Sequence, residues 1–310
     1  MLFVISNLCP GGAQRTIINI VNNLDRNKFS TALLVLNKTN EESLFRLLRK
    51  DVQIEYLGTK ARKAVFILLK KMKQYKPDII FSTLVHVNIV TYFSWVLYRK
   101  KAILFLREAS QISNLNPKLK TTYKYIMKRV DYNVVLTKKM KEDLEYIYRV
   151  NENQIFIKSN PIDIAEIKRL MLDDNTLKST KTINLVTVGR LSHVKNHKMI
   201  IKALNYFKKK YNTQIHLNIV GEGSLRNTLI DLVKKNDLFE NVSFIGNVEN
   251  PYKYIQKADI MLVSSRSEGF PHVIIESMIC ETPIIATDVP GINELIINLK
   301  NGILVPNDHN

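Results

Sequence analysis

Residues 264–294 read SSRSEGFPHVIIESMICETPIIATDVPGINE, and this stretch carries the strongest structural signal in the chain. The apolar run 260–263 directly before it predicts a buried strand. A helix is expected from Pro271, because proline suits the first helical position. Residues 283–286 then predict a further strand. Two apolar strands joined by a helix indicate parallel strands in a sheet that is covered on both faces.

The same alternation of strand and helix extends through the rest of the chain. In the first half, strands are expected at residues 2–6, 31–36, 52–56, 78–82, 103–106 and 133–136, and helices at 17–24, 43–50 and 65–75. In the second half, strands are expected at 183–188, 215–220 and 242–245, and helices at 196–210 and 224–235. The pattern predicts an α/β fold with parallel sheets.

One polar stretch divides the two halves. Residues 173–181 (DDNTLKSTK) lack periodicity, which is typical of a boundary. We therefore expect an N-terminal domain of residues 1–175 and a C-terminal domain of residues 176–310. The predicted architecture is two facing, Rossmann-like, doubly wound domains. Ligands would bind at the carboxyl ends of the strands, in the cleft between the domains.

Composition excludes several classes of protein. The 310 residues are 45% hydrophobic and 24% charged, which excludes a disordered or fibrous chain. Cys9 and Cys280 lie far apart, so neither a disulfide framework nor a structural zinc site is expected. The longest apolar run, residues 88–98, is too short to cross a bilayer, and the first residues lack a signal-peptide pattern. A cytoplasmic protein is the expectation.

The charge is distributed unevenly along the chain. Residues before Ala165 include 28 basic and 13 acidic side chains, a net charge of +15. The remainder has 18 basic and 15 acidic side chains, a net charge of +3. A general lysine bias would raise the net positive charge of both halves, so the asymmetry points to a negatively charged partner for the first half. That partner is either nucleic acid or an anionic membrane face.

Two glutamates in the opening stretch carry the clearest chemistry. Glu276 lies on the otherwise apolar predicted helix, and Glu268 lies in the loop before it. A carboxylate on such a helix is unexpected unless it meets a partner such as a pair of sugar hydroxyls. Backbone N–H groups at the helix start could hold a diphosphate. The alternative is that Glu276 merely lies at the edge of an amphipathic helix.

A pair of cations follows another predicted strand. Arg190 and Lys195 both lie between the end of that strand and the next helix, so their charges can converge on phosphate oxygens. Alternatively, both are solvated surface cations. The glycine turns Gly11-Gly12 and Gly221-Glu222-Gly223 are weaker signals for an anion site, because such turns are as often merely tight connections.

Together these motifs resemble glycosyltransferase family 4, whose members are retaining enzymes of the GT-B fold. Glu268 and Glu276 match the family's E-x7-E motif. The resemblance is to the type that assembles polysaccharide and lipopolysaccharide. It extends in the expected order over nearly the whole chain, through Gly11–Arg15, Asn160–Asp163, Gly189-Arg190 with Lys195, Gly221–Gly223 and Pro290-Gly291 with Glu294.

The resemblance implies a role for each matching residue. Arg190 and Lys195 would neutralise the donor diphosphate, Glu276 would bind the ribose hydroxyls, and Glu268 would position the donor sugar. The loop after Gly246 would read the base. The remaining implied donor-binding residues are Gly11, Gly12, Gly189, Gly221, Gly269, Phe270, Pro271, His272 and Val273. The resemblance also implies that no cofactor or bound metal is needed, because the nucleotide-sugar is itself a substrate.

The acceptor side departs from the most common family pattern. Arg107-Glu108 stands where many relatives have a histidine near the reacting sugar. Glu108 would contact a sugar, or would form a structural ion pair with Arg107. His86 and Asn88 follow another predicted strand and are further acceptor-side candidates. The resemblance also implies that helices completing the second domain would follow residue 310, so the chain is expected to be truncated at its C-terminus.

The resulting functional prediction is a retaining, hexosyltransferase-type enzyme. It would move a sugar from a nucleotide-sugar, with a UDP-sugar expected, onto a growing, lipid-linked glycan. The basic first half fits peripheral binding at the inner face of the plasma membrane. Basic residues interleaved with tyrosines form a candidate surface: Lys118, Lys120, Lys124, Lys128 and Arg129, followed by Lys138, Lys139 and Lys141. The alternatives are a nucleotide-sugar epimerase, a non-catalytic nucleotide-sugar binder and a nucleic-acid binder. No nucleic-acid-binding motif supports the last of these.

Overall fold

The computed structural model describes residues 1–9, 11–39, 43–109, 115, 117–171, 182–211 and 213–307. The chain divides into two compact units, Met1–Ile162 and Asp163–Asn310. The division differs from the predicted one after residue 175, because helix α6 (Ile164–Met171) packs on helices of the second unit, α9 (Tyr252–Lys257) and α10 (His272–Ile279). Asn250 Nδ2 also donates to the Leu170 carbonyl at 2.8 Å. The polar stretch 173–181, which suggested the boundary, lies outside the described residues.

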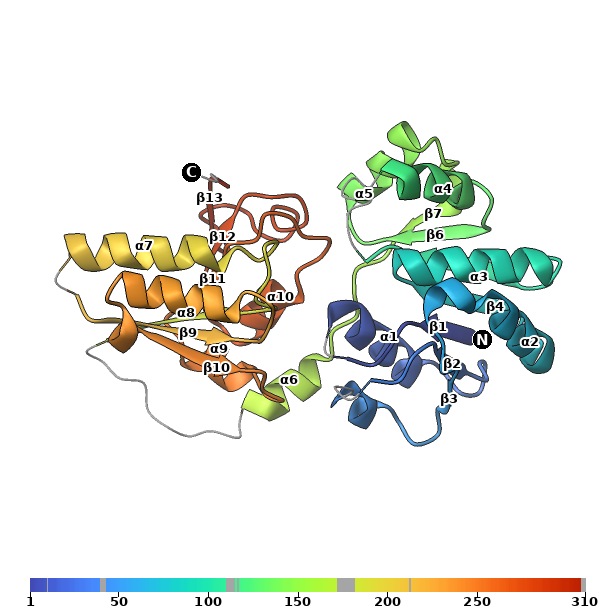
Figure 1. The fold of residues 1–310 in the computed structure, drawn as a ribbon, viewed down its shortest axis with the longest axis horizontal. Coiled ribbons are helices and arrows are strands. Elements are labelled where there is room, and N and C mark those ends of the chain that lie inside the picture. The colour runs from blue at the N-terminus through green and yellow to red at the C-terminus, as the bar shows by residue number, and fades with distance from the viewer. Residues whose placement is uncertain are drawn as a thin grey trace. The chain divides into compact units, whose positions relative to one another are not determined.

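The first unit is a seven-stranded parallel sheet with the order β3-β2-β1-β4-β5-β6-β7 (Figure 1). Its strands are β1 (Leu2–Ile5), β2 (Ala32–Val35), β3 (Gln53–Tyr56), β4 (Ile79–Thr83), β5 (Ile103–Arg107), β6 (Tyr132–Val135) and β7 (Ile155–Ile157). Its helices include α1 (Gly12–Asn23), α2 (Val65–Tyr75), α3 (Val85–Leu97), α4 (Pro117–Met127) and α5 (Lys138–Glu142). All four residues of β1 and all four of β2 are buried, as strands covered on both faces must be.

The second unit is a six-stranded parallel sheet with the order β10-β9-β8-β11-β12-β13 (Figure 1). Its strands are β8 (Ile183–Val188), β9 (Ile215–Val220), β10 (Val242–Gly246), β11 (Ile260–Val263), β12 (Ile284–Thr287) and β13 (Ile303–Val305). Helices α7 (His197–Lys210) and α8 (Arg226–Lys235) complete the unit with α6, α9 and α10. The chain runs outward from β8 to β10 and then returns to place β11 on the other side of β8. The β8–β11 junction is therefore the topological switch point of this sheet, the usual ligand position in such folds.

Several predicted elements differ from those observed. The helix expected at 43–50 is a short 3-10 helix, Ser43–Leu47. Pro271 is the N-cap of α10 rather than its first residue. The sequence analysis assigned no element to helices α3, α4, α5, α6 and α9 or to strands β7 and β13. Helix α3 is apolar on most sides and rich in β-branched residues, so periodicity does not distinguish it from a strand. Within the described part of the chain, no helix is both long enough and apolar enough to cross a bilayer.

A buried polar network joins β4, β5, α3 and α4 in the first unit. Asn88 on α3 is fully buried, accepts from Ser82 Oγ at 2.7 Å, and donates to Glu108 Oε1 at 3.0 Å. Its amide also lies 2.7 Å from the hydroxyl of Tyr123 on α4. The Tyr123 hydroxyl in turn donates to Glu108 Oε1. The network therefore ties two helices to the carboxyl ends of two strands.

Arg107 and Glu108 bond to different partners, so the structure does not support the ion pair considered above. Arg107 donates to Thr83 Oγ1 at 2.9 Å and to Asn160 Oδ1. Burial raises the pKa of Glu108 to about 7, although the bonds from Tyr123 and Asn88 and the Arg107 charge oppose this shift. Glu108 Oε2 is buried and has no hydrogen-bond partner in the described structure. The carboxyl is thus held where its charged form is disfavoured.

The buried carboxyl generates a prediction about stability. Because the folded pKa of Glu108, about 7, exceeds its ordinary value of 4.5, the folded state binds this proton more tightly. Protonated Glu108 therefore adds to the free energy of unfolding; this contribution is complete at acidic pH and is lost as pH rises through 7. Between about pH 5 and about pH 8 the loss should be roughly 3 kcal/mol. The variant Glu108→Gln, which mimics the protonated acid, should lack this dependence and become the more stable protein at the alkaline end.

Urea unfolding followed by fluorescence measures this directly. The single tryptophan of the chain, Trp95, is buried in α3 and reports on the first unit. Glu142→Gln, a change of an exposed carboxylate on α5, is the matched control and should keep the wild-type pH dependence. An unchanged difference between wild type and Glu108→Gln across the pH range would contradict the assigned protonation.

Candidate functional site

The candidate residues of the second unit gather at one edge of its sheet. Loops after five neighbouring parallel strands carry them: 189–196 after β8, 221–225 after β9, the residues after Gly246 in β10, 264–271 after β11 and 288–294 after β12. The carboxyl ends of parallel strands share one edge, so motifs separated by a hundred residues of sequence come together there. The sequence-predicted donor-side residues of this unit are therefore brought to one place.

Glycines allow the backbone of these loops to pack closely. A Cβ at Gly221 would lie 2.1 Å from the Gly189 carbonyl oxygen, and one at Gly223 would lie 2.4 Å from that of Leu191. Gly221 also has a φ of +137°, a region that favours glycine. The Gly221 amide donates to the Gly246 carbonyl at 2.8 Å, so the loops after β8, β9 and β10 support one another.

A fourth glycine fixes the loop that carries Glu268. Gly291 has a φ of +87°, and a Cβ there would lie 2.7 Å from the Glu268 carbonyl oxygen and 2.8 Å from that of Gly269. Any larger residue would push the backbone of the Glu268 loop away. The Pro290-Gly291 motif therefore holds this loop in place without itself contributing a functional side chain.

Lys195 and Glu268 meet at the topological switch point. Lys195 Nζ lies 2.5 Å from Glu268 Oε1, an ion pair between the loop after β8 and the loop after β11. The lysine side chain is 25% exposed and the glutamate side chain 12%, so the pair is accessible but largely shielded. A charged pair with this geometry can exchange its mutual contact for an anion on the lysine and a hydrogen-bond donor on the carboxylate.

Serine and threonine side chains hold this ion pair in position. Ser265 Oγ donates to Glu268 Oε1 at 2.5 Å, and Thr287 Oγ1 donates to the Ser265 carbonyl at 2.6 Å. Ser264 Oγ donates to the backbone carbonyls of Lys195 and Asn196. Sequence reasoning missed these residues. The serines that closely precede Glu268 in SSRSE were the available signal, and Thr287 had none.

Arg190 and Glu276, the remaining charged candidates of this unit, differ in burial. Arg190 is exposed, and among the described residues its side chain has no hydrogen bond or ion pair. Glu276 is 6% exposed, on the first turns of α10. Burial and the Glu276 carboxylate raise the pKa of the Cys280 thiol to about 12, so that cysteine stays protonated. A buried carboxylate in a helix of apolar neighbours is the unusual feature that the sequence indicated.

The start of α10 supplies backbone donors. Its first N–H groups have no partners within the helix, and no side chain caps it. Pro271 has no N–H, so the backbone donors on either side of it are the amides of Phe270 and of the first residues of α10. The Phe270 ring contacts the His272 ring edge-on at 6.3 Å between centroids.

His197 is a buried neighbour of the ion pair. Its pKa is lowered to about 4, chiefly by burial and also by the Lys195 charge. The imidazole is therefore neutral at physiological pH. It adds no positive charge beside Lys195.

The candidates of the first unit are placed differently. Gly11 is the N-cap of α1, which begins at Gly12, five residues before the predicted range. His86 is exposed on the first turn of α3, after Leu84, whose φ of +77° strains the turn out of β4. Asn88, Arg107 and Glu108 are instead buried in the polar network, and each is 2% exposed or less. Of the four acceptor-side candidates, His86 is thus the one that the structure leaves open to solvent.

Comparisons with known proteins identify the family of the chain. A family model described as Glycosyltransferase Family 4 matches residues 10–166, and one described as Glycosyl transferases group 1 matches residues 168–310. An N-acetylgalactosamine-N,N'-diacetylbacillosaminyl-diphospho-undecaprenol 4-alpha-N-acetylgalactosaminyltransferase of Campylobacter jejuni is 29% identical, covering 98% of this chain and 85% of its own length. The capsular polysaccharide biosynthesis glycosyltransferase CapH of Staphylococcus aureus is 22% identical, covering 89% of this chain and 78% of its own.

Solved structures show the same fold. HepE of Anabaena in complex with UDP-glucose superposes with a TM-score of 0.80 at 17% identity, covering 98% of this chain and 85% of its own. The lipopolysaccharide outer core galactosyltransferase WaaB superposes with a TM-score of 0.73 at 18% identity, covering 100% of this chain and 87% of its own. The two parallel sheets are those of the GT-B fold, and the chain belongs to glycosyltransferase family 4.

Proposed function

We propose that this glycosyltransferase transfers a hexose-type sugar from a UDP-sugar to a growing, lipid-linked glycan, with retention of anomeric configuration. The contact of Lys195 with Glu268 at the switch point carries the proposal. It puts a cation for a phosphate and a carboxylate for a sugar hydroxyl within one contact distance.

The donor would be held by groups of the second unit. Lys195 and Arg190 would bind diphosphate oxygens, together with the amides that open α10. Glu276 would accept hydrogen bonds from the two ribose hydroxyls, which explains a buried carboxylate at that position. Glu268, once separated from Lys195, would accept a hydrogen bond from the donor sugar. The loop after Gly246 would contact the base.

The chemistry would require charge stabilisation at the leaving group. The bond between the anomeric carbon and the diphosphate oxygen breaks, and the bond from the acceptor hydroxyl forms on the same face. The leaving phosphate oxygen takes the acceptor's proton. Lys195 and Arg190 would stabilise the negative charge that develops on the diphosphate. Because these cations serve that role, we propose that the reaction needs no bound metal.

The acceptor and location are supported by the relatives. The Campylobacter relative is named for an undecaprenyl diphosphate substrate, and CapH is named for capsular polysaccharide synthesis. HepE has been solved with UDP-glucose, which supports a UDP-sugar donor. A lipid-linked acceptor would require the enzyme to work at a membrane face. The net charge of +15 before Ala165 supports peripheral binding to anionic lipid there.

Calorimetric titration separates the two halves of the donor site. Glu276→Ala should raise the Kd for both UDP and uridine by about tenfold to a hundredfold, because a charged hydrogen bond to ribose is lost. Arg190→Ala should raise the Kd for UDP by a similar factor but leave the Kd for uridine unchanged. Glu240→Ala, a change of an exposed carboxylate, is the control. Wild-type protein that prefers GDP, or Glu276→Ala protein that binds UDP normally, would contradict the assignment.

Product analysis tests the reaction itself. NMR of the glycoside formed from an α-linked UDP-sugar should show an α product, with the same initial rate in the presence of excess EDTA. A β product would contradict retention, and a rate abolished by EDTA and restored by Mg²⁺ would contradict metal independence. Conversion of the UDP-sugar to its epimer without acceptor would show that the alternative activity is correct.

Vesicle sedimentation tests membrane binding through α4. Lys120, Lys124 and Lys128 are only partly buried, and the Arg129 guanidinium stacks 3.5 Å from the Tyr125 ring centroid. The side chain of Lys118 lies outside the described residues. Changing Lys120 and Lys128 to Gln should reduce binding to anionic vesicles about tenfold or more. UDP binding should be unchanged, and unaltered sedimentation would contradict a role for this helix.

A further inference from the structure

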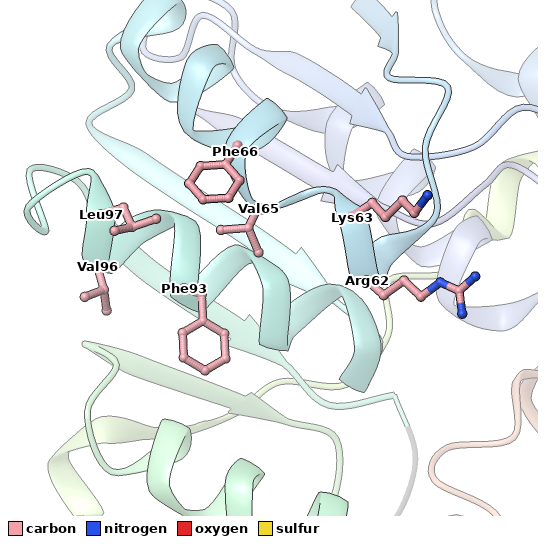
Figure 2. A pocket seen from close by; sticks show the side chains of 7 residues that line it. All are labelled: Arg62, Lys63, Val65, Phe66, Phe93, Val96 and Leu97. Carbon is pink, nitrogen blue, oxygen red and sulfur yellow. The ribbon is translucent and has the colours of Figure 1, made fainter.

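An apolar pocket opens on the first unit, away from the strand ends that carry its candidate residues. It has a volume of about 570 Å³ and lies between the start of α2 and the end of α3. Figure 2 shows the apolar side chains gathered on the two helices, with the two cations at one end. We call it the α2–α3 surface; it consists of Arg62, Lys63, Val65, Phe66, Phe93, Val96 and Leu97.

The apolar side chains of this surface are unusually exposed. Phe66 is 75% exposed, Leu97 49%, Phe93 42% and Val96 40%. The opposite side of α3 is buried in the unit through Val87, Val90 and Trp95. A helix that is apolar on both sides normally has a cover on both. A contiguous apolar patch of this kind marks a surface that another body covers.

The surroundings of the patch are almost uniformly basic. Residues 57–106 contain ten Lys and Arg side chains and a single acidic one, Asp78. Asp78 directly precedes β4, and its carbonyl accepts from the Ile103 amide at 2.8 Å, a few residues beyond the end of α3. Arg62 and Lys63 line the pocket, and Arg99, Lys100 and Lys101 follow Leu97. Whatever covers the patch must therefore tolerate many cations at its edge.

We propose that the α2–α3 surface docks on an anionic phospholipid bilayer, with Phe66, Phe93, Val96 and Leu97 entering the acyl region and Arg62 and Lys63 binding lipid phosphates. This inference rests on the proposed membrane association and assigns it a principal contact. Aliphatic and phenyl side chains bordered by cations match the boundary between acyl chains and anionic headgroups.

Charge disfavours the other occupants. In a symmetric dimer the same basic surface would face itself and bring like charges together. A nucleic acid would satisfy the cations, but Val96 and Leu97 offer nothing to its backbone or to base edges. A bilayer satisfies both halves of the surface at once.

The surface is continuous with the basic helix already considered. Helix α3 packs against α2 on one side and against α4 on the other. Phe93 contacts Tyr92 edge-on, with 5.5 Å between ring centroids, on the same helix. One side of the first unit therefore presents basic and apolar side chains from three neighbouring helices, with α3 as the middle one.

The experiment is sedimentation with vesicles of equal phosphatidylglycerol and phosphatidylcholine, and with phosphatidylcholine alone. Phe66→Ser with Leu97→Ser should reduce binding to the anionic vesicles about tenfold or more, and so should Arg62→Gln with Lys63→Gln. Matched controls lie in the second unit: Phe239→Ser, whose residue is 58% exposed, and Lys198→Gln with Lys202→Gln. All variants should bind UDP like the wild type, and the fluorescence of the buried Trp95 should show that the first unit of each Phe66/Leu97 and Arg62/Lys63 variant is folded.

The outcomes distinguish this inference from the proposed function. Loss of vesicle binding in the Phe66/Leu97 variant with normal UDP affinity supports the inference. If α4 variants lose binding but the Phe66/Leu97 variant does not, the inference is wrong and the proposed function stands. Wild-type protein that does not bind anionic vesicles would overturn the inference. Failure of the proposed transfer reaction would instead appear in the UDP titrations and the product analysis. A Phe66-dependent dimer by ultracentrifugation, or an Arg62-dependent gel shift without vesicle binding, would assign the surface to another partner.

Discussion

The close approach of backbone at the carboxyl ends of β8 and β9 is the constraint on which the donor-side geometry depends. With 2.1 Å between a hypothetical Gly221 Cβ and the Gly189 carbonyl oxygen, no side chain fits at Gly221. This contact fixes the course of the loop that carries Arg190 and Lys195. Gly291 does the same for the loop of Glu268. The ion pair between these loops is thus a consequence of backbone packing, and its side chains need no covalent or metal support to meet.

The sequence was sufficient to predict the architecture and to place the donor-side candidates of the second unit in loops at the carboxyl ends of strands. Short, fully apolar strands separated by helices predicted both parallel sheets, and strand ends marked by glycine located the loops. What periodicity could not supply was helix α3, whose residues VHVNIVTYFSWVL are apolar on nearly every side. Residues 164–171, which form helix α6, were placed in the N-terminal domain; their packing on α9 and α10, which local composition does not reveal, joins them to the second unit.

The acceptor side shows what residue types alone do not determine. Asn88, Arg107 and Glu108 are polar and follow strand ends, which is the pattern of a binding site. In the structure these residues join α3 and α4 to the sheet, which only their hydrogen bonds show. Asn88, for example, bonds to Ser82, Glu108 and Tyr123. Ser265 and Thr287 show the converse. They act through Glu268 rather than on a ligand, so their importance depends on distances that no spacing in the chain encodes.

The pairing of Lys195 with Glu268 has a consequence for selectivity. Each group already satisfies the other, so a small anion that took the lysine would leave the carboxylate with one partner fewer in a shielded position. A ligand that brings both a phosphate for Lys195 and a hydroxyl for Glu268 restores both contacts. The site without ligand would thus bind inorganic phosphate and free nucleotides, which are abundant in a cell, more weakly than the complete nucleotide-sugar.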